Sequence, residues 1–223
     1  MKNILNIIEN ILFPQFCEQC ESSLLKHNSI MCDTCLSKLQ PTELNNWVKD
    51  LTTHEYLDFA YSIFWFDEIL QKSIHHVKYN NYEKIISILI QIAEFQITQV
   101  FNEINPDILV PIPLYHVKYR ERGFNQAERI AKPISKLSHI SIDTKIIKRV
   151  KWTNSQTKLN IEERNMNTGN AFKSKTNIDN KRILLIDDIL TTGSTANSCA
   201  KVLKSNGAKW VGILTIGTPI VKK

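Results

Sequence analysis

The chain of 223 residues can form one domain with a small addition, and 43% hydrophobic with 22% charged residues indicates a globular protein. It has no run of about 18 apolar residues, which excludes a membrane-spanning helix, and no uninterrupted apolar leader, so we expect a cytoplasmic location. Residues 1–110 carry a net charge of −7 and residues 111–223 a net charge of +13. The basic half indicates a phosphorylated ligand or a nucleic acid, although a dipolar surface without a ligand is the alternative.

The first predicted element is an amphipathic helix over residues 4–12, which ends near Pro14. Docking of its apolar side on the rest of the protein is the favoured interpretation. A helix on a membrane surface is the alternative, and it would bring the protein to the inner face of the membrane. Lys2 alone supplies little positive charge for such an anchor.

Four of the five cysteines form two Cys-x-x-Cys pairs, Cys17 with Cys20 and Cys32 with Cys35, separated by eleven residues. Each pair can present two thiolates from a tight turn, and four thiolates make a closed tetrahedral site that favours structural zinc. Two disulfides or a redox dithiol are the alternatives, but disulfides fit a cytoplasmic chain poorly and a redox motif needs one pair. The fifth, Cys199, follows a helical apolar pattern and is predicted to be a core residue.

Strands and helices alternate after a linker with helical character over residues 41–57, and a polar segment over residues 151–170 is predicted to be a long loop. Strands are predicted over residues 60–66, 107–111, 140–150, 182–187 and 210–215, and helices over residues 67–79, 82–103, 126–138 and 195–206. This order predicts an α/β fold with a mostly parallel sheet flanked by helices. We expect two domains, a helix with a zinc ribbon over residues 1–45 and the α/β domain over residues 46–223.

The run from Ile183 to Thr195 joins a buried strand to a helix through an acidic pair and a hydroxyl-rich turn. In open α/β sheets, ligands bind at the carboxyl ends of the strands. Hydroxyls and backbone N–H groups of the turn suit a phosphate, and Asp187 and Asp188 suit the hydroxyls of a sugar. The pattern therefore predicts a ribose 5-phosphate site, since helix capping would explain only one or two of the four hydroxyls. The turn consists of Thr191, Thr192, Gly193, Ser194 and Thr195.

The same thirteen residues resemble the phosphoribosyl pyrophosphate (PRPP) binding motif of type I phosphoribosyltransferases, and further landmarks resemble the ComF/GntX family in their order along the chain. These landmarks are Phe13-Pro14 with the first cysteine pair, Lys78-Tyr79, Val110–Leu114, Arg120–Ala127, Thr153-x-x-Gln156-x-x-Leu159, Arg164-x-x-Asn167 and Ala171-Phe172. The resemblance implies a zinc ribbon followed by a type I phosphoribosyltransferase-like domain, with PRPP and magnesium as ligands. One departure is Asn80-Asn81, where we expect a glycine.

The resemblance also implies roles for individual residues. Asp187 and Asp188 would hold the ribose hydroxyls and stabilise positive charge on the ribose, which makes them the candidate catalytic residues, and the turn would hold the 5-phosphate. Arg120 and Arg122 would supply positive charge near the pyrophosphate, because guanidinium groups suit bidentate phosphate contacts. A solvated basic surface is the alternative for both arginines.

The polar loop over residues 151–170 is a candidate lid that would exclude water from the reacting centre. Its candidate lid residues are Lys151, Gln156 and Arg164. A surface loop without a role is the alternative. Aromatic residues of the first predicted strand, such as Tyr61 and Trp65, could stack on an acceptor base, but aromatic strands are more typical of a core.

Members of the ComF/GntX family are linked to natural competence, so the resemblance implies a role in DNA uptake and partners in the competence machinery. The implied activity is that of a phosphoribosyltransferase, with an acceptor that the sequence does not identify. A non-catalytic protein that responds to PRPP, or an adaptor that binds single-stranded DNA, stays open. The basic half of the chain favours the contact with DNA.

Overall fold

The computed structural model describes residues 16–24, 30–80, 83–150, 171–174 and 178–219, with the backbone alone over residues 75–80. The predicted helix over residues 4–12 and the predicted loop with Lys151, Gln156 and Arg164 lie outside the described residues.

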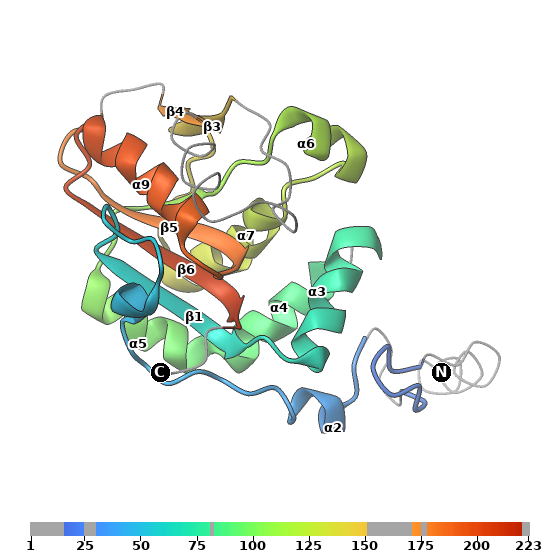
Figure 1. Ribbon diagram of the computed structural model, residues 1–223. Helices are drawn as coiled ribbons and strands as arrows, with labels where there is room; N and C mark the ends of the chain where they lie inside the picture. The colour runs from blue at the N-terminus through green and yellow to red at the C-terminus, as the bar shows by residue number, and fades with distance from the viewer. Residues whose placement is uncertain (1–15, 25–29, 81–82, 151–170, 175–177, 220–223) are drawn as a thin grey trace.

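A four-stranded parallel sheet lies at the centre of the α/β part, in the order β1-β6-β5-β2 (Figure 1). Its two middle strands are almost continuously apolar, as expected of strands that are covered on both faces. The mostly parallel sheet is therefore confirmed. The strands are β1 (Phe59–Trp65), β2 (Ile108–Pro111), β5 (Arg182–Ile189) and β6 (Trp210–Thr218).

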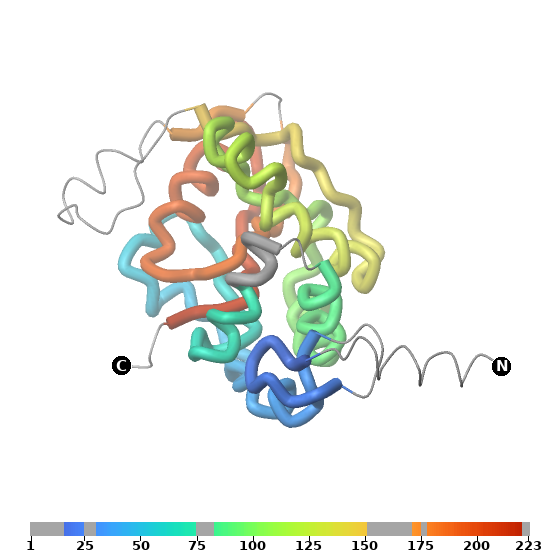
Figure 2. Tube along the Cα trace, turned by 90° about the vertical axis from the view of Figure 1, so that its right-hand side faces the viewer, coloured from blue at the N-terminus to red at the C-terminus, as the bar shows by residue number. Residues whose placement is uncertain are grey.

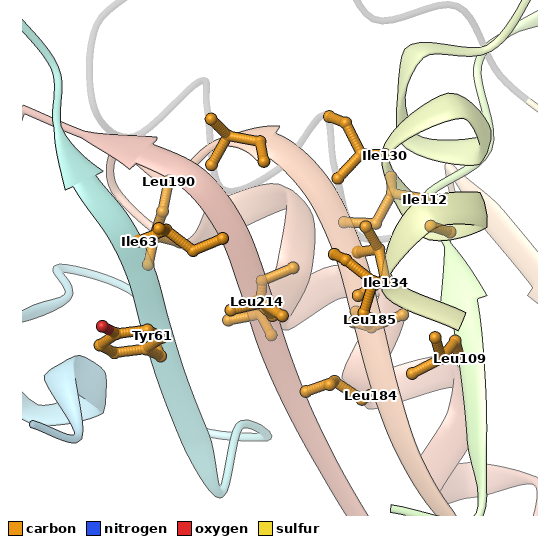
Figure 3. Packing of buried hydrophobic residues seen from close by; sticks show 14 of the residues in the cluster. Tyr61, Ile63, Leu109, Ile112, Ile130, Ile134, Leu184, Leu185, Leu190 and Leu214 are labelled. Carbon is orange, nitrogen blue, oxygen red and sulfur yellow. The ribbon is translucent and has the colours of Figure 1, made fainter. Parts of the chain in front are cut away.

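Helices cover both faces of this sheet. On one face α7 packs on β5 and β2, with α4 and α5 beside it, and on the other face α9 packs on β6. Figure 3 shows Ile134 of α7 next to Leu185 of β5, and both side chains are fully buried. The helices are α3 (Glu68–Asn80), α4 (Glu83–Ile92), α5 (Glu94–Ile104), α6 (His116–Arg122), α7 (Gln126–Ser138) and α9 (Ser194–Ser205).

The helix predicted over residues 82–103 is two helices, because the chain bends by 72° between α4 and α5. Ala93 lies at the break with φ −95° and ψ 11°, and it is fully buried. Each helix carries its own apolar face, and the bend lets both faces reach the core. Among the described residues no single helix is long and apolar enough to cross a membrane, and α4 and α5 meet that criterion only when counted together.

The strand predicted over residues 140–150 is interrupted. Ile142 forms an isolated parallel bridge to Leu109, and β3 (Ile147–Arg149) pairs antiparallel with β4 (Phe172–Ser174) in a separate two-stranded sheet. Between them the Asp143 carboxylate accepts the backbone N–H groups of residues 145 and 146, at 2.6 and 3.2 Å. A side chain that takes up backbone donors competes with strand pairing, so the chain turns there.

The N-terminal segment lies at one end of the molecule, beside the α3 and α4 region (Figure 2). It includes α2 (Asp33–Leu36), and its buried Met31 accepts a hydrogen bond at Sδ from Ser73 Oγ of α3. The chain then runs antiparallel to the end of β1, where Pro41 bridges Phe64. The predicted division at residue 45 stays a prediction.

The helical character predicted for residues 41–57 is confined to the 3-10 turn η1 (Trp47–Asp50). Trp47 is buried and packs edge-on against Trp65 of β1, with ring centroids 5.3 Å apart. Tyr61 is fully buried, which confirms its core role, as is the neighbouring Phe64, whereas Trp65 is half-buried and packs against the core.

Candidate functional site

The two cysteine pairs come together near the N-terminus. Their four sulfur atoms lie within 4.8 Å of one another, and the Sγ atoms of Cys20 and Cys32 are 3.7 Å apart. Tetrahedral geometry around zinc, with Zn–S bonds of about 2.3 Å, separates two sulfurs by about 3.8 Å. A disulfide needs about 2.05 Å, and all five cysteines are free thiols. The arrangement of Cys17, Cys20, Cys32 and Cys35 fits a four-cysteine metal site and not the disulfide alternative.

Hydrogen bonds shape both cysteine turns. The Cys17 N–H donates to the carbonyl oxygen of Ser22 at 2.8 Å, and the Cys32 N–H donates to Cys17 Sγ at 3.4 Å. Hydrogen bonds from Ser22 lower the pKa of Cys20 to about 6, whereas burial raises the pKa of Cys35 to about 12. A bound cation would stabilise all four groups as thiolates, because metal binding releases the thiol protons.

The predicted acidic pair lies at the carboxyl end of β5, where both side chains are half-buried. One carboxylate oxygen of Asp187 accepts the N–H of Asp188 at 2.9 Å, and Asp188 in turn accepts the N–H of Ile189 at 2.8 Å. These short-range contacts fix both carboxylates at the edge of the sheet where ligands bind in open α/β folds.

An open hollow lies beside this edge. Five of the seven residues that the sequence assigned to the ribose phosphate line it, whereas Asp188 and Thr192 are not among its lining residues. The five are Asp187, Thr191, Gly193, Ser194 and Thr195. The hydroxyl of Thr192 instead lies 3.3 Å from Ser194 Oγ and 3.4 Å from Ser194 N, so it closes the turn from within.

Gly193 is the N-cap of α9 and has a left-handed backbone with φ +81°. The N–H groups of the first helical turn after it have no acceptors within the helix, and they carry the positive end of the helix dipole. Ser194, Thr195 and Ala196 of this turn line the same hollow as Asp187. The arrangement suits a ligand that combines a phosphate with hydroxyl groups.

Two residues outside the run from Ile183 to Thr195 complete the site. Thr215 of β6 is the register partner of Asp187, and Ile112 lies at the end of β2; both line the hollow. Alignment of the ends of the two predicted strands would have pointed to Thr215. Ile112 belongs to the Val110–Leu114 landmark, and its position beside the hollow depends on the pairing of β2 with β5.

Arg149 of β3 is also brought to this region by the fold. Its guanidinium carbon lies 5.4 Å from the centre of the Phe172 ring on β4. Burial lowers the pKa of Arg149, and the negative charge of Asp187 opposes that change. Burial next to Asp187 keeps the pKa of the Cys199 thiol well above its usual range, so Cys199 is a neutral core residue as predicted.

Arg120 and Arg122 lie on α6, a helix that the sequence analysis did not predict. Arg120 is exposed, and Arg122 is half-buried and donates a hydrogen bond to Gln126 Oε1 of α7. Neither arginine is among the lining residues of the hollow. Asn125, the N-cap of α7, accepts the N–H of Ala127 and donates to the carbonyl of Ile112 at 3.0 Å, so it fixes the chain after β2.

Comparison with known proteins is consistent with this geometry. The model of the phosphoribosyl transferase domain family matches residues 78–220. Competence protein F of Haemophilus influenzae is 30% identical, over 90% of this chain and 83% of that protein. DNA utilization protein YhgH of Escherichia coli K12 is 28% identical, over 88% of this chain and 81% of that protein.

A solved hypoxanthine phosphoribosyltransferase from Staphylococcus aureus is 20% identical, over 60% of this chain and 62% of that structure, with a TM-score of 0.37. The family model and the parallel sheet flanked by helices establish the type I phosphoribosyltransferase fold. The chain therefore belongs to the ComF family of competence proteins, whose members carry a phosphoribosyltransferase domain.

Proposed function

We propose that this chain binds PRPP with magnesium at the carboxyl edge of the sheet and acts in DNA uptake. The observation that carries the proposal is the shared hollow, which is lined by Asp187 and by the hydroxyl-bearing turn at the N-terminus of α9. A pentose phosphate needs acceptors for its hydroxyls and donors for its phosphate, and both kinds of group are close together here. The names of the relatives, a competence protein and a DNA utilization protein, support the cellular role.

In the proposed reaction an acceptor nucleophile forms a bond to C1 of PRPP, the bond from C1 to the pyrophosphate oxygen breaks, and pyrophosphate leaves with the electron pair. The acceptor proton passes to solvent. The protein would contribute position and charge: Asp187 and Asp188 on the ribose hydroxyls, and the turn Thr191 to Thr195 on the 5-phosphate. Magnesium takes oxygen ligands, so it would neutralise the pyrophosphate and use few protein groups.

The four-cysteine cluster belongs to the proposal as a structural zinc site. Four sulfur ligands leave no open coordination position, so the ion would stabilise the N-terminal segment and take no part in transfer. The sulfur spacing at Cys20 and Cys32 supports zinc.

The double variant Asp187→Asn/Asp188→Asn tests the ligand assignment. Loss of the charge on both acceptors should weaken binding of PRPP with magnesium by at least about tenfold, because a hydrogen bond to a charged group contributes about 1.5–3 kcal/mol. Titration calorimetry measures the affinity, and Asp179→Asn, at an exposed carboxylate near the opposite end of β5, is the matched control. Equal affinities of the double variant and the wild type would remove the assignment.

A second candidate function, binding of single-stranded DNA, is favoured by the β3–β4 pair. Lys148 and Lys173 are register partners there, and both are exposed. Like charges directly opposite each other destabilise a sheet, and a polyanion such as DNA would offset the repulsion.

The variant Lys148→Gln/Lys173→Gln should bind a single-stranded oligonucleotide more weakly and should reduce the slope of log K against log salt by about 0.7 for each lost phosphate contact. Fluorescence anisotropy at several salt concentrations measures this slope. The control is Lys132→Gln/Lys136→Gln, which removes two exposed charges from α7. A slope that falls equally in both variants would argue against a specific contact at the β3–β4 pair.

A further inference from the structure

Residues 46–58 form a compact loop, here called the strap, whose two ends are held together. Asn46 Oδ1 accepts the N–H of Val48 at 3.1 Å and that of Ala60 at 3.0 Å, and Asn46 Nδ2 lies 3.4 Å from the carbonyl oxygen of Asp58. A loop of this length with closed ends and its own packed side chains is an Ω-loop, a class that is frequently functional.

The C-terminal end of the strap, at Asp58, is fixed to the central domain. The carboxylate of Asp58 accepts the N–H of Val211 of β6 at 2.8 Å and forms an ion pair with Lys204 of α9 at 2.8 Å. The ammonium group of Lys201 lies 5.5 Å from the centre of the Tyr56 ring. The strap therefore lies against α9 and β6, the two elements next to the proposed phosphate turn.

The strap also supports the turn directly. The Thr53 N–H donates to the carbonyl oxygen of Thr192 at 3.0 Å. A Cβ atom added to Gly193 would lie 2.6 Å from Thr53 O and 2.9 Å from Leu51 Cδ1, so the strap backbone and the buried Leu51 meet the turn without a gap.

Asn197 of α9 connects the strap to the turn. Its side chain is only 6% exposed; Oδ1 accepts the N–H of Tyr56 at 2.8 Å, and Nδ2 donates to the carboxylate of Glu55. The backbone N–H of Asn197 donates to the carbonyl oxygen of Gly193 at 2.8 Å. A single residue therefore holds the strap through its side chain and the turn through its backbone.

From these contacts we infer that the strap and Asn197 are positioning elements that keep the turn Thr191 to Thr195 in the shape required to bind a phosphate. The inference rests on the proposed function, because it concerns the same site. None of Thr53, Glu55, Tyr56 and Asn197 is among the lining residues of the hollow, so they act on the ligand through the turn. Loss of the contacts between the strap, Asn197 and the turn would let the turn adopt other conformations. The apparent affinity for PRPP then falls in proportion to the fraction of molecules in which the turn keeps its binding conformation.

The test uses a charge repulsion and its rescue. Asn197→Asp keeps the acceptor for Tyr56 but brings a second carboxylate against Glu55, whereas Glu55→Gln/Asn197→Asp restores a donor and acceptor pair. In ligand-free protein the amide hydrogens of Thr53 and Ser194 should exchange about tenfold faster in Asn197→Asp, through local opening, and should return to the wild-type rate in the double variant. Hydrogen exchange measured by NMR gives both rates. Glu55→Ala, at an exposed position, provides a milder variant that is expected to fold.

PRPP affinity is the second readout, and we expect it to fall about fivefold in Asn197→Asp and to recover in the double variant. Ile97→Val, a core truncation in α5, lowers global stability by about 0.5–1.5 kcal/mol and should change neither readout. Unchanged exchange at Thr53 and Ser194, an unrescued double variant, or altered exchange with unaltered affinity would each overturn the inference. A wild type that does not bind PRPP would overturn the proposed function instead, and the exchange rates would still decide whether the strap holds the turn.

Discussion

Replacement of Cys35 by serine is expected to abolish metal binding and to disorder the N-terminal segment, while the central sheet stays folded. Cys35 is 3% exposed, and its sulfur belongs to the four-cysteine cluster. Structural zinc contributes an apparent binding free energy of about 10–16 kcal/mol in small zinc modules, so the segment has little order without it. The sheet is covered by α7 on β5 and β2 and by α9 on β6, and none of these helix–strand contacts involves the cysteine segment.

Elemental analysis should find one zinc ion per chain in the wild type and in Cys199→Ala, and much less than one in Cys35→Ser. The amide hydrogens of Cys17 and Glu18, which are hydrogen-bonded to Ser22 O and Ile30 O, should lose their protection from exchange in Cys35→Ser. Cys199 is the matched control because it is a buried thiol outside the cluster. Freshly purified wild type without zinc, but with protected Cys17 and Glu18 amides, would contradict the zinc assignment.

The central sheet and the cysteine cluster could be predicted because each depends on a local pattern. The apolar run before Asp187 is typical of a doubly covered strand, and two Cys-x-x-Cys pairs specify four ligands by spacing alone. The bend at Ala93 could not be predicted in the same way, because the apolar periodicity of α4 and α5 continues across it and the bend depends on tertiary packing. The break in the strand at Asp143 could not be predicted either. The Asp143 carboxylate takes up backbone N–H groups that could otherwise pair with a neighbouring strand, and which of the two occurs depends on the tertiary structure.

The residues of the candidate site likewise differ in whether they could be predicted from a local pattern. Residues contiguous in sequence, Asp187 and the turn up to Thr195, could be assigned from one motif. Thr215 and the strap reach the site only through the pairing of β6 and the packing of residues 46–58, more than 130 positions from the turn. The resemblance implies Arg120 and Arg122 as positive groups near the pyrophosphate, whereas in the structure Arg122 donates to Gln126 and neither arginine lines the hollow.

Gly193→Ala is expected to have the largest effect of any single substitution in the turn. With φ +81°, the new side chain would adopt a left-handed backbone that costs about 1–2 kcal/mol. Its Cβ would also lie 2.6 Å from Thr53 O, a backbone atom that cannot rotate away, and such overpacking costs about 1–3 kcal/mol. Together these terms predict a loss of about 2–5 kcal/mol in the free energy of unfolding, or displacement of the strap with loss of PRPP affinity.

Gly123→Ala is the matched control, because Gly123 has φ +76° but nothing lies within 4 Å of the position that a Cβ would take. Gly123→Ala introduces the backbone strain without a steric clash, so urea unfolding should show a loss of only about 1–2 kcal/mol in the free energy of unfolding. The difference between the two variants measures the contact between strap and turn. Equal losses, with PRPP affinity kept in both, would mean that the strap can retreat from the turn at no cost, and then the close approach at Thr53 would not determine the shape of the phosphate site.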